Sequence, residues 1–395
     1  MKILHCSLLL FIFFLQAQDH YQAIVPRVRV KIDETPMTEN KKWVIAISGP
    51  VLLADETKKG KKINASQLTI TCKKNCFYIN GKPCLRRESP DHKAEPVTCL
   101  RFLIERGGTC TYNDHCYYGY LELRMHKETV LLINAIELEE YVYAVVCAES
   151  IPCWPLEVQK TQSILTRSYV LAIIADMEKR KEPYHVTNTN LHQVYKGNIG
   201  EFVQIRTAVK ETKGKFLAHD GSAARTEFDI CCGGAIPKKM QGIDFKKAPY
   251  MARGYACKYC KHYTKVYSWK ASYEKHMLEA HLQKYIPELK RLERIVIAKK
   301  DAAGLVHELL VHGKGGVKKK VTGQQWYSWF KEIKSFMFTI KRKGTTYHIQ
   351  GNGTGHHRGY CQWGGRRMAE LGFKHGAILK YYYPGTQLQS LPKKQ

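Results

Sequence analysis

The sequence predicts an α+β fold, because the spacing of its hydrophobic residues changes along the chain. Over residues 25–135, hydrophobic and polar side chains alternate, as they do in half-buried strands. Beyond Leu138 the hydrophobic residues recur at helical spacing. A chain of 395 residues also exceeds the usual size of one domain, so we expect at least two.

A β-rich accessory domain is expected over residues 18–135. Apolar and polar residues alternate at 28–32, 43–47 and 121–125, and residues 130–133 form a short run typical of a buried strand. Glycine-containing turns separate these strands, at Asn80-Gly81 and Gly107-Gly108. We expect this domain to pack on the next one along the chain.

A helical core with a mixed sheet is expected over residues 136–386, followed by a tail at 387–395. One helix begins at Pro155, since proline suits the first helical position, and it ends before Pro183. One stripe of this helix comprises Leu165, Tyr169, Ile173 and Met177. Further elements are a helical stretch at 273–294, a strand at 295–297 and a hairpin that closes at Lys343-Gly344.

Glu149 is the acidic residue whose position most suggests chemistry. It ends an apolar helical run, and Pro152 and Pro155 interrupt the chain before the next helix. Apolar neighbours such as Trp154, and the negative end of the preceding helix dipole, would favour the protonated carboxyl and raise its pKa. A raised pKa suits a general acid that works near neutral pH. The alternative is a structural carboxylate that caps the second helix or pairs with a base.

A second block, residues 351–386, is rich in glycine and aromatic residues. Glycine permits close approach of a ligand to the backbone, and His356, Gln362 and Trp363 suit the hydroxyl and amide groups of a sugar. The same residue types also form ordinary turns and cores. The block alone therefore does not predict sugar binding, and the rest of the sequence must decide between these interpretations.

Five segments, in this order along the chain, resemble the SpoIID/LytB family of peptidoglycan-acting proteins. They are residues 149–155 (ESIPCWP), 162–169 (QSILTRSY), 193–197 (QVYKG), 232–234 (CGG) and the glycine-rich block at 351–386. The resemblance implies a lytic transglycosylase that cleaves the glycan strands (MurNAc–GlcNAc) of peptidoglycan. Glu149 would protonate the glycosidic oxygen and then accept the proton of the C6 hydroxyl, which gives a 1,6-anhydro product.

The resemblance also implies roles for further residues. Arg167 would orient the substrate or tune Glu149, and the glycan would contact Tyr195, His356, Gln362 and Trp363. The alternatives are a salt bridge from Arg167 to Glu139, Glu140 or Glu149, and a core position for Tyr195. Hydrolysis would instead need a second carboxylate, and we identify none as well placed, although Glu227 or Asp229 could fold in.

Two departures and one alternative function accompany the resemblance. Residues 355–362 read GHHRGYCQ, where the family has GHGVGMSQ, so the bulky His357 and Arg358 should narrow or recharge the groove. Some members of the family enhance a separate cell-wall amidase. A non-catalytic peptidoglycan-binding protein that enhances an amidase is therefore the alternative.

Residues 1–17 have the features of a secretory signal: a lysine at position 2, an apolar run from Leu8 to Leu15 and a small-residue site near Ala17. We expect export to the periplasm or cell envelope with the signal removed; a retained N-terminal anchor is the alternative. The net charge of +28 fits the anionic polymers and lipids of that location. The alternative is a solvated lysine-rich surface that accounts for most of the charge. Nucleic acid is not expected as a partner of an exported protein.

Fourteen cysteines suit an oxidising compartment. The six between residues 72 and 116 would allow three disulfides, and a Cys147–Cys153 bridge would fix the loop that carries Glu149. Downstream, Cys231, Cys232, Cys257 and Cys260 could together form a structural zinc site or two disulfides, and the exported location favours the disulfides.

The family resemblance supports the zinc interpretation, because some members bind zinc beside the catalytic groove. Four cysteine ligands leave no open coordination position, so this zinc would be structural, and catalysis should require no cofactor. A zinc finger formed with His276 and His281 is disfavoured, because 15 residues separate Cys260 from His276, against about 12 in the usual pattern.

Overall fold

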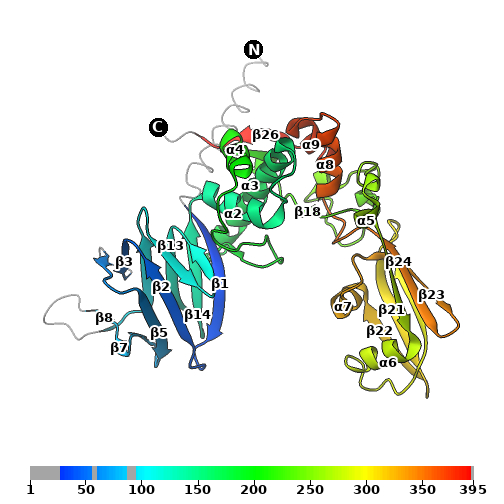
Figure 1. Ribbon diagram of the computed structural model, residues 1–395, viewed down its shortest axis with the longest axis horizontal. Helices are drawn as coiled ribbons and strands as arrows, with labels where there is room; N and C mark the ends of the chain where they lie inside the picture. The colour runs from blue at the N-terminus through cyan, green and yellow to red at the C-terminus, as the bar shows by residue number, and fades with distance from the viewer. Residues whose placement is uncertain (1–26, 56–59, 87–94, 393–395) are drawn as a thin grey trace, which may run out of the picture. The chain divides into compact units, whose positions relative to one another are not determined.

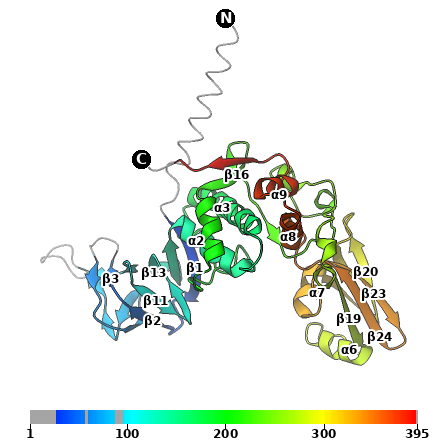
Figure 2. The same cartoon turned by 45° about the horizontal axis from the view of Figure 1, so that its top comes forward.

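The computed structural model describes residues 27–392, apart from 56–59 and 87–94, and has the predicted α+β fold (Figures 1 and 2). The chain divides into two units: unit 1 is Met1–Arg225 with Leu388–Gln395, and unit 2 is Thr226–Gln387. The expected signal at 1–17 lies outside the described residues. None of the described helices combines the length and hydrophobicity that a membrane span requires.

Two β-sheets of unit 1 enclose one hydrophobic core. The first has the order β15-β1-β14-β13-β10-β3-β4, and the second β12-β11-β2-β5-β6-β7. The strands are β1 (Val28–Pro36), β2 (Lys42–Ser48), β3 (Val51–Ala54), β4 (Lys61–Lys62), β5 (Gln67–Lys73), β6 (Cys76–Ile79), β7 (Lys82–Pro83), β10 (Cys99–Ile104), β11 (Thr109–Tyr112), β12 (His115–Tyr117), β13 (Tyr120–His126), β14 (Thr129–Ile136) and β15 (Val186–Thr187), with a separate pair β8 (Leu85–Arg86) and β9 (Glu95–Pro96). In β2 every second residue is buried, so the predicted alternation is confirmed.

Among its described residues, unit 1 also contains the helices α2 (Leu138–Glu149), α3 (Leu156–Lys179) and α4 (Val203–Glu211). Figure 1 shows them together beside the strands. A small sheet, β17 (Ser222–Ala223), β16 (Lys215–His219) and β26 (Gln387–Ser390), follows. Val30 of β1, Val142 of α2 and Leu171 of α3 belong to one core. The boundary expected between residues 135 and 136 therefore falls inside unit 1, because the strands and helices bury their apolar faces against one another.

Unit 2 has its own core, formed by two three-stranded sheets and two helices. These elements are β19 (Ser268–Glu274), β24 (Thr346–Asn352) and β23 (Met337–Lys343) in one sheet, β20 (Leu292–Lys300), β21 (Val306–Gly313) and β22 (Val317–Thr322) in the other, and helices α6 (Lys275–Gln283) and α7 (Gly323–Trp329). The predicted hairpin joins β23 to β24, and Gly344 has a φ of 58° in its turn. The expected helix at 273–294 begins only at Lys275 and ends at Gln283.

The remaining part of unit 2 contains a short parallel strand pair and several short helices. The strands are β18 (Phe228–Asp229) and β25 (Tyr360–Cys361); the helices are η1 (Pro237–Lys239), η2 (Pro249–Met251), η3 (Cys260–His262), α5 (Thr264–Tyr267), α8 (Gln362–Glu370) and α9 (His375–Tyr382). Asp229 lies opposite Cys361 in the register of β18 and β25. This pairing brings together two segments that lie far apart in the sequence.

His185 ties the end of α3 to β1 in unit 1. The backbone N–H of Arg29 donates to its Nδ1 at 3.0 Å, so the ring proton is on Nε2, which donates to the Glu178 carboxylate at 2.8 Å. The side chain is only 2% exposed. Burial, together with the charge of Arg29, lowers the pKa of His185 from 6.5 to about 4, although Glu178 acts in the opposite direction.

We expect unit 1 to lose stability as the pH falls from about 6.5 to about 4. The folded state holds His185 neutral, so the unfolded state binds the additional proton in this window, and a decrease in pH favours unfolding. The loss should not exceed about 3.5 kcal/mol, since one pKa unit corresponds to about 1.4 kcal/mol. Urea unfolding at several pH values measures it. His185→Gln should weaken the dependence of the unfolding free energy on pH between about 6.5 and 4. An unchanged dependence would show that other titrating groups cause it.

Candidate functional site

Glu149 is the last residue of α2, and the chain leaves the helix at Ser150 in an extended conformation. The side chain is half-buried, and Trp154 in the following turn is buried. The backbone N–H of Val194 donates a hydrogen bond of 2.7 Å to Glu149 Oε1. This bond connects residues 149–155 to residues 193–197, two of the segments that carry the family resemblance. The carboxylate is thus held at the predicted break between two helices.

Two stacked tyrosines, Tyr141 and Tyr195, contact the elements joined by the Glu149–Val194 hydrogen bond. The rings of Tyr141 and Tyr195 have centroids 5.6 Å apart, and Tyr141 donates a hydrogen bond to Gln193 Oε1 at 3.1 Å. Tyr195 donates to Asn134 Oδ1 at 2.5 Å and is buried in the core. Burial raises the pKa of both hydroxyls well above the usual value, and Glu149 adds to the effect on Tyr141. Tyr195 therefore supports the site from the core and does not line a groove, which is the structural alternative stated above.

Arg167 is fully buried on α3 and forms a salt bridge with Glu139 of α2. Its Nε and one terminal nitrogen donate to the two oxygens of Glu139 at 3.0 and 2.6 Å. The other terminal nitrogen donates to the backbone oxygen of Lys215 in β16 at 2.8 Å. The bidentate pair joins α2 and α3 and holds β16 against them. The side chain of Arg167 has no exposed surface, so the structure shows the salt bridge to Glu139 that was the stated alternative. A role of Arg167 toward the substrate stays a prediction.

The other acidic residues of α2, α3 and α4 are joined to basic side chains in the structure. The pairs are Glu139–Arg167, Glu140–Arg206, Glu157–Lys160, Asp176–Arg180, Glu178–Arg29 and Glu211–Lys160. Glu139–Arg167 joins α2 to α3, and Glu178–Arg29 joins α3 to β1. Glu149 accepts a hydrogen bond from the backbone of the 193–197 segment.

The glycine-rich block lies in unit 2, where the buried carboxylate of Asp229 braces it. Asp229 Oδ1 accepts hydrogen bonds from the N–H groups of Ile230 and His356 at 2.9 and 3.2 Å, and Oδ2 accepts from His357 at 2.5 Å. Burial raises the pKa of Asp229, although the neighbouring histidines and these amides act in the opposite direction. The carboxylate of Asp229 in β18 therefore fixes the backbone of the loop at His356 and His357.

His357 is an internal residue and not part of a groove wall. Its side chain is fully buried, Phe336 N–H donates to Nε2 at 3.3 Å, and Nδ1 lies 3.0 Å from the backbone oxygen of Cys232. Since Nε2 accepts, Nδ1 carries the proton and donates to Cys232. The expectation that His357 would narrow the groove is wrong, because the ring packs inward. Arg358 is partly exposed and lies 3.7 Å from Glu227.

The three predicted sugar-contacting residues of this block have different surroundings. His356 is exposed, and its Nδ1 accepts a hydrogen bond from Arg358 N–H at 3.1 Å. Gln362 is buried at the start of α8. Trp363 is half-buried, 4.6 Å from the ring of Tyr263 and 4.9 Å from the guanidinium of Arg366. Their contacts with glycan stay a prediction.

Gly355 accommodates the protein's own carboxylate. Its φ is 112°, and an added Cβ would lie 1.7 Å from Asp229 Oδ1. We therefore expect Gly355→Ala to destabilise unit 2 by at least about 2 kcal/mol, from backbone strain together with the steric clash. Gly372→Ala is the matched control, since its φ is 88° but nothing lies within 4 Å of the added Cβ. Thermal unfolding compares the stability of the two variants. An equal loss of stability would mean that the Asp229 carboxylate moves away from the added Cβ at no cost in free energy.

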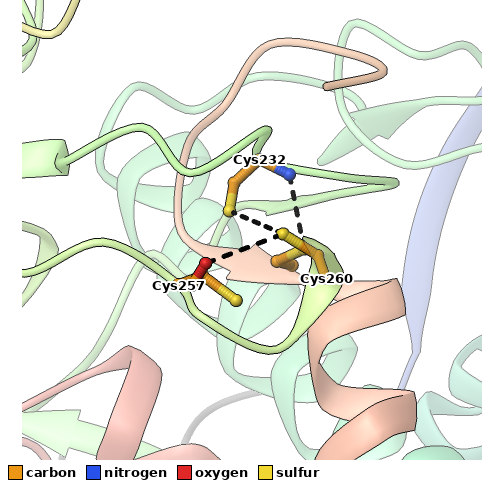
Figure 3. Close-up of side chains that lie close together, drawn as sticks. Cys232, Cys257 and Cys260 are labelled. Atoms are coloured by element: carbon orange, nitrogen blue, oxygen red, sulfur yellow. Dashed lines mark hydrogen bonds between the residues drawn. The ribbon is translucent and has the colours of Figure 1, made fainter. Parts of the chain in front are cut away.

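Four buried cysteines of unit 2 form a cluster, with the sulfur atoms of Cys232, Cys257, Cys260 and Cys361 all within 4.8 Å of one another. Figure 3 shows the first three, with the sulfurs of Cys232 and Cys260 joined by a dashed line at 3.8 Å. The fourth member of the cluster is Cys361 and not the expected Cys231. Cys231 is buried and directly precedes Cys232 in the sequence. Cys361 was missed because it lies far from the other three in the sequence, and the pairing of β18 with β25 brings it close.

No disulfide is present within the residues that the structure describes. The three expected bridges between residues 72 and 116 are therefore not formed, and neither is a Cys147–Cys153 bridge: Cys147 is buried, whereas Cys153 is exposed. The histidines of the disfavoured zinc finger do not join the cysteine cluster either. His281 instead contacts the backbone oxygen of Trp329 at 2.8 Å.

The fold and the site define a mixed α+β protein that holds an acidic residue at a helix break. Residues 126–219, which include α2, α3 and α4, match the family model described as Stage II sporulation protein. Residues 126–219 of this chain are therefore similar to the SpoIID/LytB family. Residues 254–359 match a second family model, described as a domain of unknown function (DUF8618).

Three relatives illustrate the range of the similarity. An uncharacterized protein of Brachyspira hyodysenteriae is 29% identical over 280 residues, which cover 70% of this chain and 73% of that protein. Stage II sporulation protein D of Bacillus amyloliquefaciens is 26% identical over 292 residues, or 65% of this chain and 75% of that protein. The amidase enhancer of Bacillus subtilis is 45% identical over 58 residues, which are 15% of this chain and 8% of that protein.

Proposed function

We propose that this protein is an exported lytic transglycosylase that cleaves peptidoglycan glycan strands with Glu149 as its general acid and base. The observation that carries the proposal is the position of Glu149. Its carboxylate lies at the end of α2 and accepts a 2.7 Å hydrogen bond from Val194, inside the region that matches the sporulation family. A fixed carboxyl group of this kind suits proton transfer to a bound substrate.

The reaction needs one carboxyl group in two protonation states. Protonated Glu149 donates its proton to the glycosidic oxygen as the bond from the anomeric carbon breaks, and positive charge develops on the sugar. The Glu149 carboxylate then removes the proton from the C6 hydroxyl of the same sugar. The C6 oxygen bonds to the anomeric carbon, which closes the 1,6-anhydro ring without water and returns Glu149 to its protonated form.

Two features around Glu149 support a reaction with a single carboxylate. The other acidic residues of α2, α3 and α4 are ion-paired, whereas hydrolysis requires a second carboxyl group at a separation of about 5–9.5 Å. In addition, Ser150 Oγ and Gln193 Nε2 are buried and have no hydrogen-bond partner among the described residues. Each is adjacent in sequence to a residue of the Glu149–Val194 hydrogen bond. Buried polar atoms without partners are rare in folded proteins and are often found at functional sites.

Product analysis tests the proposal. Purified peptidoglycan, both intact and stripped of stem peptides, is incubated with the protein and the products are identified by mass spectrometry. We expect 1,6-anhydro ends on the released fragments. Reducing ends would show hydrolysis and a second carboxylate, and would contradict the proposed mechanism. A difference between the two substrates would show whether stem peptides must be removed first.

The second candidate is a non-catalytic peptidoglycan-binding protein that enhances a cell-wall amidase. The observation that favours it is the 45% identity to the amidase enhancer of Bacillus subtilis, although this similarity covers only 58 residues. The protein would then bind glycan without releasing products, and would accelerate a separately added cell-wall amidase. Retention of this acceleration by Glu149→Gln, with no products from either protein alone, would favour the second candidate over the first.

A further inference from the structure

We propose that Cys232, Cys257, Cys260 and Cys361 together bind one zinc ion. This ion would join the two ends of the 254–359 segment to the rest of unit 2. The four sulfur atoms are buried and lie within 4.8 Å of one another. Zinc bound to four thiolates has Zn–S distances of about 2.3 Å, so a tetrahedron places the sulfurs about 3.8 Å apart. The sulfurs of Cys232 and Cys260 are 3.8 Å apart. A disulfide would need about 2.05 Å.

The spacing of the cysteines in the chain suits this geometry. Cys257 and Cys260 form a C-x-x-C turn that leads into the short helix η3, and such pairs are common in structural zinc sites. Cys232 follows β18, and Cys361 ends β25 and directly precedes α8. Three separate segments thus supply the ligands, and the four thiolates complete a tetrahedral site without an open position for water.

Groups around the cluster would stabilise metal-bound thiolates. The backbone N–H of Cys232 donates to Cys361 Sγ at 3.3 Å, and the hydroxyl of Tyr382 lies 3.1 Å from Cys257 Sγ, where it can donate to a thiolate. Hydrogen bonds of this kind orient ligands and tune the metal. Gly364 of α8 is also required here, since an added Cβ would lie 2.7 Å from Cys257 Sγ and 2.1 Å from the Tyr382 oxygen.

Arg253 provides an independent observation that points to negative charge in the cluster. Its side chain is 1% exposed, and none of its three guanidinium nitrogens has a hydrogen-bond partner among the described residues. The guanidinium lies 5.2–5.5 Å from the ring centroids of Tyr255, Tyr381 and Tyr382, and it interacts electrostatically with Cys232 and Cys257. A buried cation without a counter-charge is costly. Zn²⁺ with four thiolates carries a net charge of −2, which would supply that counter-charge.

The site has a structural consequence for the 254–359 region. This match begins three residues before Cys257 and ends two residues before Cys361, so the ligands lie where the segment leaves and rejoins the rest of unit 2. A metal ion that joins both ends of a long segment lowers the conformational entropy of its unfolded state. The zinc would therefore hold the two ends of the segment together and attach them to the rest of unit 2. This structural role does not depend on the proposed chemistry of Glu149.

Metal analysis of the full-length protein tests the proposal. The protein is purified anaerobically without chelators, and its metal content is measured by inductively coupled plasma mass spectrometry. We expect one zinc ion per chain. After replacement by cobalt, we expect the charge-transfer and d–d absorption typical of tetrahedral thiolate coordination. A protein that contains no metal after purification and refolding with zinc, or one with iron in place of zinc, would overturn the assignment, as would a disulfide between any two of the four cysteines.

Matched variants identify the ligands. Cys361→Ser should lose the zinc, whereas Cys231→Ser should retain it, because Cys231 is buried nearby but is not one of the four mutually close sulfurs. Cys361→His offers a second form of the test if the serine variant does not fold, since histidine is also a zinc ligand and should retain the metal. Zinc retained by Cys361→Ser and lost by Cys231→Ser would overturn the proposed ligand set.

Arg253→Met measures the role of the buried cation. We expect the variant to bind zinc at the same stoichiometry but to release it to a competing chelator at a concentration about 10-fold lower, as outer-shell changes at metal sites do. Arg294→Met is the control, because Arg294 is exposed on β20. Equal zinc affinity in both variants and the native protein would show that Arg253 does not compensate the charge of the cluster.

Discussion

Replacing Glu149 by Gln is expected to reduce the release of 1,6-anhydro products by about 10²- to 10⁴-fold, the range that general acid–base catalysis contributes. Glutamine has nearly the same shape as glutamate, and its oxygen can still accept the hydrogen bond from Val194 N–H. It cannot, however, deliver a proton to the glycosidic oxygen. The same carboxyl group is needed twice in the proposed reaction, so we expect the loss to lie toward the upper end of this range.

The matched control is Glu157→Gln. Glu157 lies in the first turn of α3, only eight residues further along the chain, but its carboxylate is engaged in an ion pair with Lys160. We expect this variant to keep the rate of the native protein, and both variants to unfold at similar urea concentrations. Rates are measured by quantifying anhydro products by mass spectrometry over time. A Glu149→Gln variant that remains fully active would remove the enzyme proposal, because no other carboxylate of α2, α3 or α4 would then be available for the reaction.

Replacing Arg167 by Met is expected to destabilise unit 1 by about 3–5 kcal/mol, the cost of breaking a buried ion pair by removing one partner. Glu139 would lose both hydrogen bonds of the bidentate pair and would keep only the one from Gly214 N–H. Lys215 would lose the donor to its backbone oxygen. The expected effect is on folding, because Arg167 is buried and holds α2, α3 and β16 together.

Arg206→Met provides the comparison for a partly exposed pair. Arg206 binds Glu140 with two hydrogen bonds, pairs with Glu201 as well and lies 3.5 Å from the ring centroid of Tyr143. Its side chain is 35% exposed, so solvent screens these ion pairs and its loss should cost less than the loss of the buried Arg167. Urea unfolding measures the stability of both variants. The double variant Arg167→Met/Glu139→Leu should recover part of the stability that Arg167→Met loses, because it leaves no uncompensated charge.

Activity separates the two roles proposed for Arg167. If the residue is structural, the folded fraction of Arg167→Met at low temperature should cleave glycan at nearly the native kcat. A variant with native stability and a lost kcat would instead show that Arg167 contacts the substrate in a conformation that differs from the one described here.

Short sequence patterns were sufficient to predict the strands of unit 1 and the position of Glu149 at the end of a helix. In β2 the alternation of apolar and polar residues placed Trp43, Ile45 and Ile47 in the core, because a strand presents successive side chains to opposite faces. The break between α2 and α3 followed from Pro152 and Pro155 in the same way. Both features depend on residues that are neighbours in the sequence.

Pairing between distant segments overrode local patterns elsewhere. Tyr273 was expected in a helix, but residues 268–274 form β19 because they pair along their whole length with β24, more than 70 residues away. The helix α6 then begins at Lys275. Helical propensity is a weak preference, and the hydrogen bonds and burial of a sheet outweigh it.

The sequence by itself determined the α+β class, the resemblance to the SpoIID/LytB family and the acidic residue at the helix break, because each depends on residue types at short spacing. The tertiary structure decided which partners the functional candidates have. It assigned Arg167 to Glu139, placed Tyr195 in the core, turned His357 inward and added Cys361 to the cysteine cluster. These outcomes depend on burial and on the register of strands such as β18 and β25, which arise only when distant segments meet.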